Sequence, residues 1–230
     1  MKTFNTPNSI STYIEQINYR ILGNLADKRR TIAFIIPPVL IIFMYPIFNS
    51  FAGVIASDKI AWYLGLITYW MIWGLFFPII IIGKKNIAEL IRPKRPTKNV
   101  VLPMSIILVG ALSSRLLVPG MEYEKQSVWI YILLLSTCFG NGFFEELLWR
   151  GVYYRLYPNN IFFRMIWPSV WFGIWHYVPV SIHNNELTGL IGMMVGPIMM
   201  GLVLSYMTKK TNTLWWSIIA HTVGGIIMIS

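Results

Sequence analysis

Two adjacent glutamates, Glu145 and Glu146, lie within the apolar run NGFFEELLWRGVYYR. Moving a carboxylate into hydrocarbon is costly, so acidic residues inside membrane segments usually have a function and a partner. Arg150 follows Glu146 by four residues, which puts both side chains on one helix face in the favourable order for an ion pair. Glu145 points about 100° away on the same helix and has no such partner. We interpret Glu146 and Arg150 as an orienting pair and Glu145 as the carboxylate available for chemistry.

Two histidines, His176 and His221, also lie within apolar runs. A helical rise of about 1.5 Å per residue places the glutamates roughly 14 Å from Arg155, His176 about 18 Å from Arg164 and His221 about 17 Å from Lys210, when these basic residues are taken as the inner face. The three predicted helices therefore bring their titratable groups to one level. We expect these groups to form one site.

A glutamate and two histidines suit hydrolysis in two ways. Glu145, His176 and His221 could hold a divalent metal such as Zn²⁺. Alternatively, Glu145 could activate water as a general base while histidine stabilises the developing oxyanion. A simpler interpretation is that these groups only hydrogen-bond one helix to another, but their matched depth on three helices argues against it. A further alternative, in which His176 and His221 are axial haem ligands, explains neither glutamate.

The composition places the chain in the class of integral membrane proteins. It is 56% hydrophobic and 12% charged, with a mean hydropathy of +0.59, whereas soluble domains average about 25% charged residues. A lone cysteine, Cys138, excludes an internal disulfide framework. The net charge of +10 does not indicate nucleic acid, because the basic residues follow the loops. We predict an all-α polytopic protein whose partners are the lipid bilayer and a peptide or protein substrate at the membrane.

Apolar runs of about 20 residues predict about seven transmembrane helices, at residues 31–56, 60–83, 100–119, 127–149, 161–181, 187–208 and 213–229. If the N-terminus is cytoplasmic, 16 of the 19 basic residues fall on the inner side, leaving Lys59 and Lys125 outside and Arg115 within a span. The positive-inside rule then puts the N-terminus in the cytoplasm and the C-terminus outside. We expect the location to be the plasma membrane of a prokaryote.

Two parts of the chain are distinguished. Residues 1–30 contain an apolar helical stripe over 10–25, which predicts an amphipathic helix that lies on the inner leaflet or packs on the protein's own cytoplasmic face. Residues 31–230 form the predicted transmembrane domain. Within it, Gly192 and Gly196 form a GxxxG motif that predicts close packing of that helix.

Three short motifs resemble those of one family. EELLWR at 145–150 is similar to an EExxxR motif, FGIWH at 172–176 to an FxxxH motif, and SYMTKKTNTLWWSIIAHTVGG at 205–225 to a third region ending in A-H. Together, in this order, they resemble the intramembrane proteases grouped as CAAX prenyl proteases and bacteriocin-processing enzymes, the CPBP or Abi family. The resemblance covers about residues 127–229.

This resemblance implies an intramembrane endopeptidase that cleaves membrane-associated peptides. It implies that Glu145 is the general base or holds the catalytic water, with His176 and His221 beside it and Glu146 and Arg150 in support. Both a zinc and a metal-free glutamate mechanism are compatible with such a site. The prokaryotic context that we expect disfavours a prenylated CAAX substrate.

One position departs from the family pattern. The family usually has Asn or Asp four residues after the last histidine, where this chain has Gly225. If that amide helps to hold the oxyanion, another donor such as Asn141 must replace it. Otherwise the chain is a non-catalytic membrane scaffold or bacteriocin self-immunity protein derived from such a protease.

Four tryptophans accompany the histidine helices. They could line a substrate groove, or they could be interfacial anchors or core residues; they are Trp171, Trp175, Trp215 and Trp216.

Overall fold

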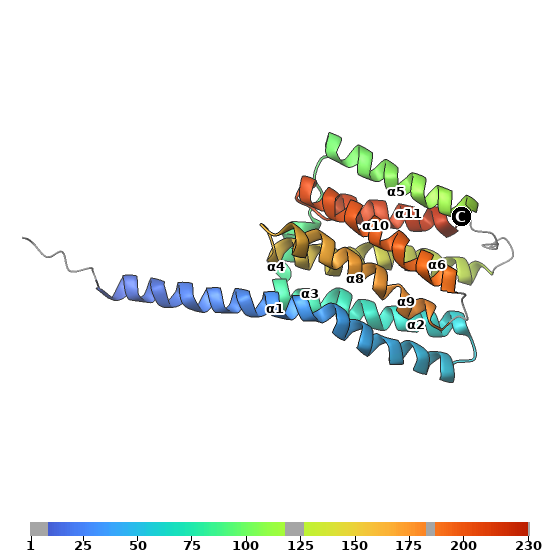
Figure 1. The fold of residues 1–230 in the computed structure, drawn as a ribbon, viewed down its shortest axis with the longest axis horizontal. Helices are drawn as coiled ribbons and strands as arrows, with labels where there is room; N and C mark the ends of the chain where they lie inside the picture. The colour runs from blue at the N-terminus through green and yellow to red at the C-terminus, as the bar shows by residue number, and fades with distance from the viewer. Residues whose placement is uncertain (1–8, 118–126, 183–186, 230) are drawn as a thin grey trace, which may run out of the picture.

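The described residues of the computed structural model, 9–117, 127–182 and 187–229, form helices and no strand (Figure 1). Lys125 and His183, which the sequence assigns to outer loops, lie outside this part of the chain. The elements, with π-helical segments labelled η, are α1 Ser9–Val54, α2 Asp58–Tyr69, η1 Trp70–Phe76, α3 Phe77–Ile82, α4 Lys84–Ile91, α5 Lys98–Leu117, α6 Val128–Gly140, η2 Asn141–Val152, α7 Tyr153–Leu156, η3 Phe162–Ile166, α8 Trp167–Trp175, α9 Tyr177–Val180, α10 Leu187–Thr211 and α11 Trp215–Ile229.

Within these residues, five helical stretches are long and apolar enough to cross a membrane, at Leu25–Val54, Asp58–Ile82, Lys98–Leu116, Val128–Leu156 and Ile191–Thr211. Each matches a predicted span. Their outer faces expose large apolar side chains such as Ile42, Ile80, Leu116 and Trp129, each more than 70% accessible. Such surfaces suit contact with lipid rather than water. The chain is therefore an integral membrane protein with an all-helical fold.

The predicted number of seven spans is not confirmed. The predicted span 161–181 is divided at His176 into η3 and α8 on one side and the single turn of α9 on the other. Pro179 lacks the N–H that would bond to the carbonyl of Trp175, which explains the break. The last predicted span corresponds to α11, which has only 15 residues.

Residues 10–25, predicted as an amphipathic helix, are helical, but they form the beginning of α1. This helix continues without interruption into the first span, and Figure 1 shows its N-terminal part extending beyond the bundle. The predicted boundary at residue 30 is therefore not the end of a helix. Contact between this part and the inner leaflet stays a prediction.

Close helix contacts in the bundle depend on glycines other than those predicted. A Cβ on Gly173 of α8 would lie 2.5 Å from the carbonyl oxygen of Met194 on α10, so only glycine permits this approach. A Cβ on Gly142 of η2 would likewise overlap the side chain of Thr222 on α11, whose Oγ1 is the nearest atom. By contrast, no atom lies within 4 Å of a Cβ built on Gly192 or Gly196. The GxxxG motif is therefore not used for packing within the described part of the chain.

Hydrogen bonds join the four predicted inner segments at one end of the bundle. The Arg30 guanidinium donates to the carbonyl of Leu156 at 2.9 Å, and Lys94 Nζ donates to the carbonyl of Asn212 at 2.7 Å. The Tyr154 hydroxyl donates to the Asn212 side chain and connects these two pairs. The segments that carry most of the basic residues thus share one face. That this face is cytoplasmic remains the prediction from charge.

Candidate active site

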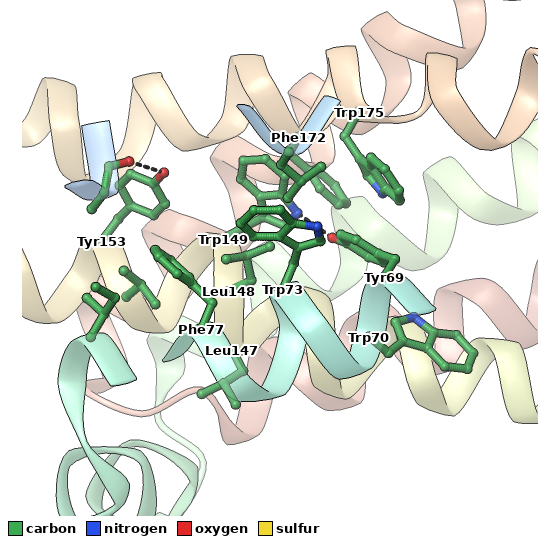
Figure 2. Close-up of a cluster of buried hydrophobic side chains, with 14 of the residues drawn as sticks. Tyr69, Trp70, Trp73, Phe77, Leu147, Leu148, Trp149, Tyr153, Phe172 and Trp175 are labelled. Atoms are coloured by element: carbon green, nitrogen blue, oxygen red, sulfur yellow. Dashed lines mark hydrogen bonds between the residues drawn. The ribbon is translucent and has the colours of Figure 1, made fainter. Parts of the chain in front are cut away.

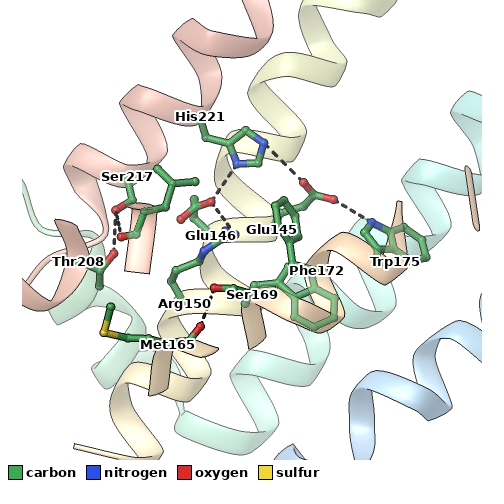
Figure 3. Close-up of polar contacts among 12 residues, drawn as sticks. Glu145, Glu146, Arg150, Met165, Ser169, Phe172, Trp175, Thr208, Ser217 and His221 are labelled. Carbon is green, nitrogen blue, oxygen red and sulfur yellow. Dashed lines mark hydrogen bonds and ion pairs between the residues drawn. The ribbon is translucent and has the colours of Figure 1, made fainter. Parts of the chain in front are cut away.

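Three packed elements supply the candidate site (Figure 3). Segment η2 carries Glu145 and Glu146, the C-terminal end of α8 leads to His176, and α11 carries His221. Both carboxylates are at most 1% accessible and His221 is 8% accessible. Such buried polar groups are stable only with hydrogen-bonding partners, so their contacts define what the site can do.

Glu146 has two buried partners. Its Oε1 accepts a hydrogen bond from Arg150 Nη1 at 3.0 Å, as the four-residue spacing predicts. The same oxygen lies 2.9 Å from His221 Nδ1. Because an ion-paired carboxylate accepts rather than donates, Nδ1 carries the proton of this bond. Glu146 and Arg150 therefore fix the His221 ring and leave Nε2 as its available nitrogen.

Glu145 is not without a partner, contrary to the sequence interpretation. Its Oε1 accepts a hydrogen bond from the indole Nε1 of Trp175 at 3.0 Å. Its Oε2 has no hydrogen-bond partner and lies 3.7 Å from His221 Nε2. The two oxygens of this carboxylate thus differ: one is held by the protein and the other faces the imidazole.

Both carboxylates lie on the π-helical segment η2, and both approach His221. An α-helix would separate their directions by about 100°, as the sequence interpretation assumes. In a π-helix the hydrogen bonds span five residues, so the turn is wider and the facing of successive side chains changes. Single π turns recur at functional sites. Hydropathy and periodicity alone carry no signal for this segment.

His176 joins the site through an aromatic neighbour. Its Nδ1 donates to the carbonyl of Phe172 at 2.7 Å, because a carbonyl can only accept. The Phe172 ring contacts both imidazoles edge-on, with centroids 4.7 Å from His176 and 6.0 Å from His221. The Arg150 guanidinium lies over the same ring at 4.3 Å. Phe172 is therefore a shared neighbour of the two histidines.

Glu145, His176 and His221 are the three predicted metal ligands, and metal binding by them stays a prediction. Among the described residues, no group of three His, Cys, Asp or Glu side chains is placed to hold an ion. A catalytic zinc takes three protein ligands with an open fourth position. Glu145 Oε2 and His221 Nε2 lie 3.7 Å apart, but His176 does not join them in a group of three among the described residues.

Gly225, the departure from the family pattern, packs against α6. A Cβ at this position would lie 3.2 Å from Cys138 Sγ, so a larger residue such as asparagine would require Cys138 to shift by a few tenths of an ångström. Asn141 is the predicted substitute donor, and its Oδ1 accepts a hydrogen bond from Trp70 Nε1 at 3.0 Å. Its amide is therefore oriented by η1.

The four tryptophans do not form one lining. Trp175 is 1% accessible and belongs to the core and to the site (Figure 2), whereas Trp216 donates to the carbonyl of Lys94 at 3.1 Å at the end of the bundle. Trp171 and Trp215 are partly buried. Sequence reasoning missed the contact of Trp175 with Glu145. The only local signal is its position next to His176 in the FxxxH motif.

A comparison with known families identifies the segment that contains this site. The family model described as "Type II CAAX prenyl endopeptidase Rce1-like" matches residues 127–227. The resemblance predicted from the motifs is confirmed. This segment, a little under half of the chain, contains both glutamates, Arg150 and both histidines, and the family is one of peptidases, which are hydrolases. Neither the curated proteins nor the solved structures yield a match to this chain.

Proposed function

We propose that this protein is an intramembrane endopeptidase that hydrolyses peptide bonds of membrane-associated substrates, with Glu145 as the general base. One observation carries the proposal: the buried, unpartnered Oε2 of Glu145 faces His221 Nε2 across 3.7 Å. This separation is too long for a direct hydrogen bond. A water that bonds to both atoms can bridge it, as waters often do between polar groups more than 3.5 Å apart.

In the proposed reaction, Glu145 Oε2 takes a proton from this water as the water oxygen attacks the scissile carbonyl carbon. The carbonyl oxygen becomes an oxyanion, and the C–N bond breaks as Glu145 returns the proton to the leaving amine. His221 contributes Nε2, which when protonated donates to the oxyanion. Glu146 accepts from Nδ1 of the same ring and holds it in place, as the orienting carboxylate does in a catalytic triad.

His176 is proposed to assist at the water. The Phe172 carbonyl accepts from its Nδ1, so its Nε2 is the nitrogen available to a second ligand. The contact of both imidazoles with the Phe172 ring supports a shared substrate position. The haem alternative gains no support, because the two rings pack on one phenylalanine and His221 is also bonded to Glu146.

The test is reconstitution in liposomes with a library of lipid-anchored and hydrophobic peptides, followed by mass spectrometry of the products. Wild-type protein should cleave a subset, and Glu145→Gln should cleave none of them. A metal chelator should leave the wild-type products unchanged, because the proposed reaction uses side chains and water alone. Loss of cleavage with chelator and recovery with Zn²⁺ would replace the glutamate mechanism with a metal mechanism.

Gly225 motivates a second candidate function. If the missing Asn or Asp abolishes hydrolysis, the chain is a non-catalytic scaffold or self-immunity partner that keeps the family fold. The contact between Gly225 and Cys138 favours this second function, because Cys138 occupies space that an Asn or Asp side chain at residue 225 would need. In that case Glu145→Gln and His176→Ala would preserve the cellular phenotype, whereas the peptidase proposal predicts that both abolish it.

A further inference from the structure

The indole of Trp175 is the direct hydrogen-bonding partner of the proposed general base. It donates from Nε1 to Glu145 Oε1 at 3.0 Å, and both side chains are about 1% accessible. A hydrogen bond to an ionised acceptor in a water-poor site is stronger than a neutral one. The bond therefore restricts rotation of the carboxylate and decides which oxygen remains available.

The Trp175 ring is itself held by residues outside the segment that matches the family. Tyr69 of α2 stacks on it with a centroid distance of 3.9 Å, and Phe48 of α1 contacts it edge-on at 6.1 Å. Tyr69 also has a separate contact, in which its hydroxyl accepts a hydrogen bond from Trp149 Nε1 at 2.8 Å. Figure 2 shows the rings of Tyr69, Trp149 and Trp175 near one another, and together with Phe48 they belong to one buried cluster. Helices α1 and α2 thus contact the indole that bonds to Glu145.

We propose that Trp175 is a positioning residue for the general base: its N–H holds Glu145 Oε1, so that Oε2 is presented to the water and to His221. Tyr69 keeps the indole in the required orientation. This inference rests on the proposed function, and it assigns different roles to the two oxygens of one carboxylate. Without the indole N–H, the carboxylate turns freely and Oε2 spends less time at the reacting position.

The chain offers a matched control in Trp149. Trp175→Phe and Trp149→Phe each remove one indole N–H from the same buried cluster. Only the hydrogen bond from Trp175 ends on Glu145, whereas that from Trp149 ends on Tyr69. Trp175→Phe should lower kcat on a cleaved peptide by about 10- to 100-fold with little change in KM, since a misplacement of about 1 Å costs up to 10²-fold. Trp149→Phe should stay within about 3-fold of wild type in kcat, because the N–H that it removes donates to Tyr69 and not to the carboxylate of Glu145. A merely structural loss would instead lower kcat in both variants alike.

A spectroscopic measurement tests the contact without relying on activity. With ¹⁵N-labelled tryptophan, the indole N–H signal that Trp175→Phe removes should shift in Glu145→Ala, whereas the Trp149 signal should stay in place. An unshifted Trp175 signal overturns the proposed contact, whatever the activity of Trp175→Phe.

The kinetic outcomes separate the two proposals. Equal kcat values for Trp175→Phe and Trp149→Phe, with Glu145→Gln inactive, overturn the positioning role and leave the peptidase proposal standing. A folded wild type that cleaves no peptide overturns both.

Discussion

At the scale of single residues, the buried carboxylate of Glu146 is the structural centre of the site, because Arg150 and His221 both bond to its Oε1. A short-range spacing rule predicts the pair with Arg150. The bond to His221 depends on the packing of α11 against η2, and the bond of Trp175 to Glu145 depends on α8. No pattern within one segment reports such contacts between helices.

Glu146→Gln should destabilise the protein strongly, because it leaves the Arg150 guanidinium buried without a compensating charge. Breaking a buried ion pair by removing one partner costs about 3–5 kcal/mol. The measurement is the free energy of unfolding in mixed micelles. Glu89→Gln is the control, because its pair with Arg155 is 3.3 Å long with both side chains at least 44% accessible, and exposed pairs contribute below about 1 kcal/mol. Equal decreases in the free energy of unfolding for Glu146→Gln and Glu89→Gln would contradict the central role of Glu146.

At the scale of helices, hydropathy is sufficient to locate the long spans, because each must cover the hydrocarbon with apolar residues. It cannot locate η1 and η2, whose π turns arise where the two segments pack on each other. It also misses the break at His176, although Pro179 gives a local reason for it. The break matters for the site, because His176 lies where α8 ends.

Gly225→Asn tests the packing of α11 on α6. The new side chain would meet Cys138, and overpacking of this kind costs about 1–3 kcal/mol. Cys138→Ala removes the Sγ atom, so the double variant should recover part of the loss, with a coupling of at least about 0.5 kcal/mol in a double-mutant cycle. Thermal unfolding in detergent measures the stability of each variant, and Cys138→Ala alone is the control. Strictly additive effects would show that residue 225 does not face Cys138.

At the scale of the whole molecule, the basic residues predict that four inner segments lie on one side, and hydrogen bonds among Arg30, Leu156, Tyr154, Lys94 and Asn212 join them at one end. Charge cannot tell which helices become neighbours within the bundle. The arrangement in Figure 1, with α10 beside α8 and α5 beside α11, follows from side-chain packing between distant segments.

The orientation can be tested with single cysteines in a Cys138→Ala background. Lys85→Cys in α4 and Asp58→Cys at the start of α2 are both exposed, and the two positions lie at opposite ends of the Asp58–Ile82 span. The positive-inside rule predicts that an impermeant maleimide labels Lys85→Cys in inverted vesicles and Asp58→Cys in intact cells. The reverse pattern would contradict a cytoplasmic N-terminus.

The central claim is that Glu145 activates water for peptide hydrolysis. The most direct measurement is kcat/KM of Glu145→Gln relative to wild type, on a peptide that the wild type cleaves, in liposomes where both proteins are folded. Loss of a general base predicts a decrease of about 10²–10⁴-fold, with the thermal unfolding temperature no lower than that of wild type. A folded Glu145→Gln variant within about 3-fold of the wild-type rate would contradict the claim.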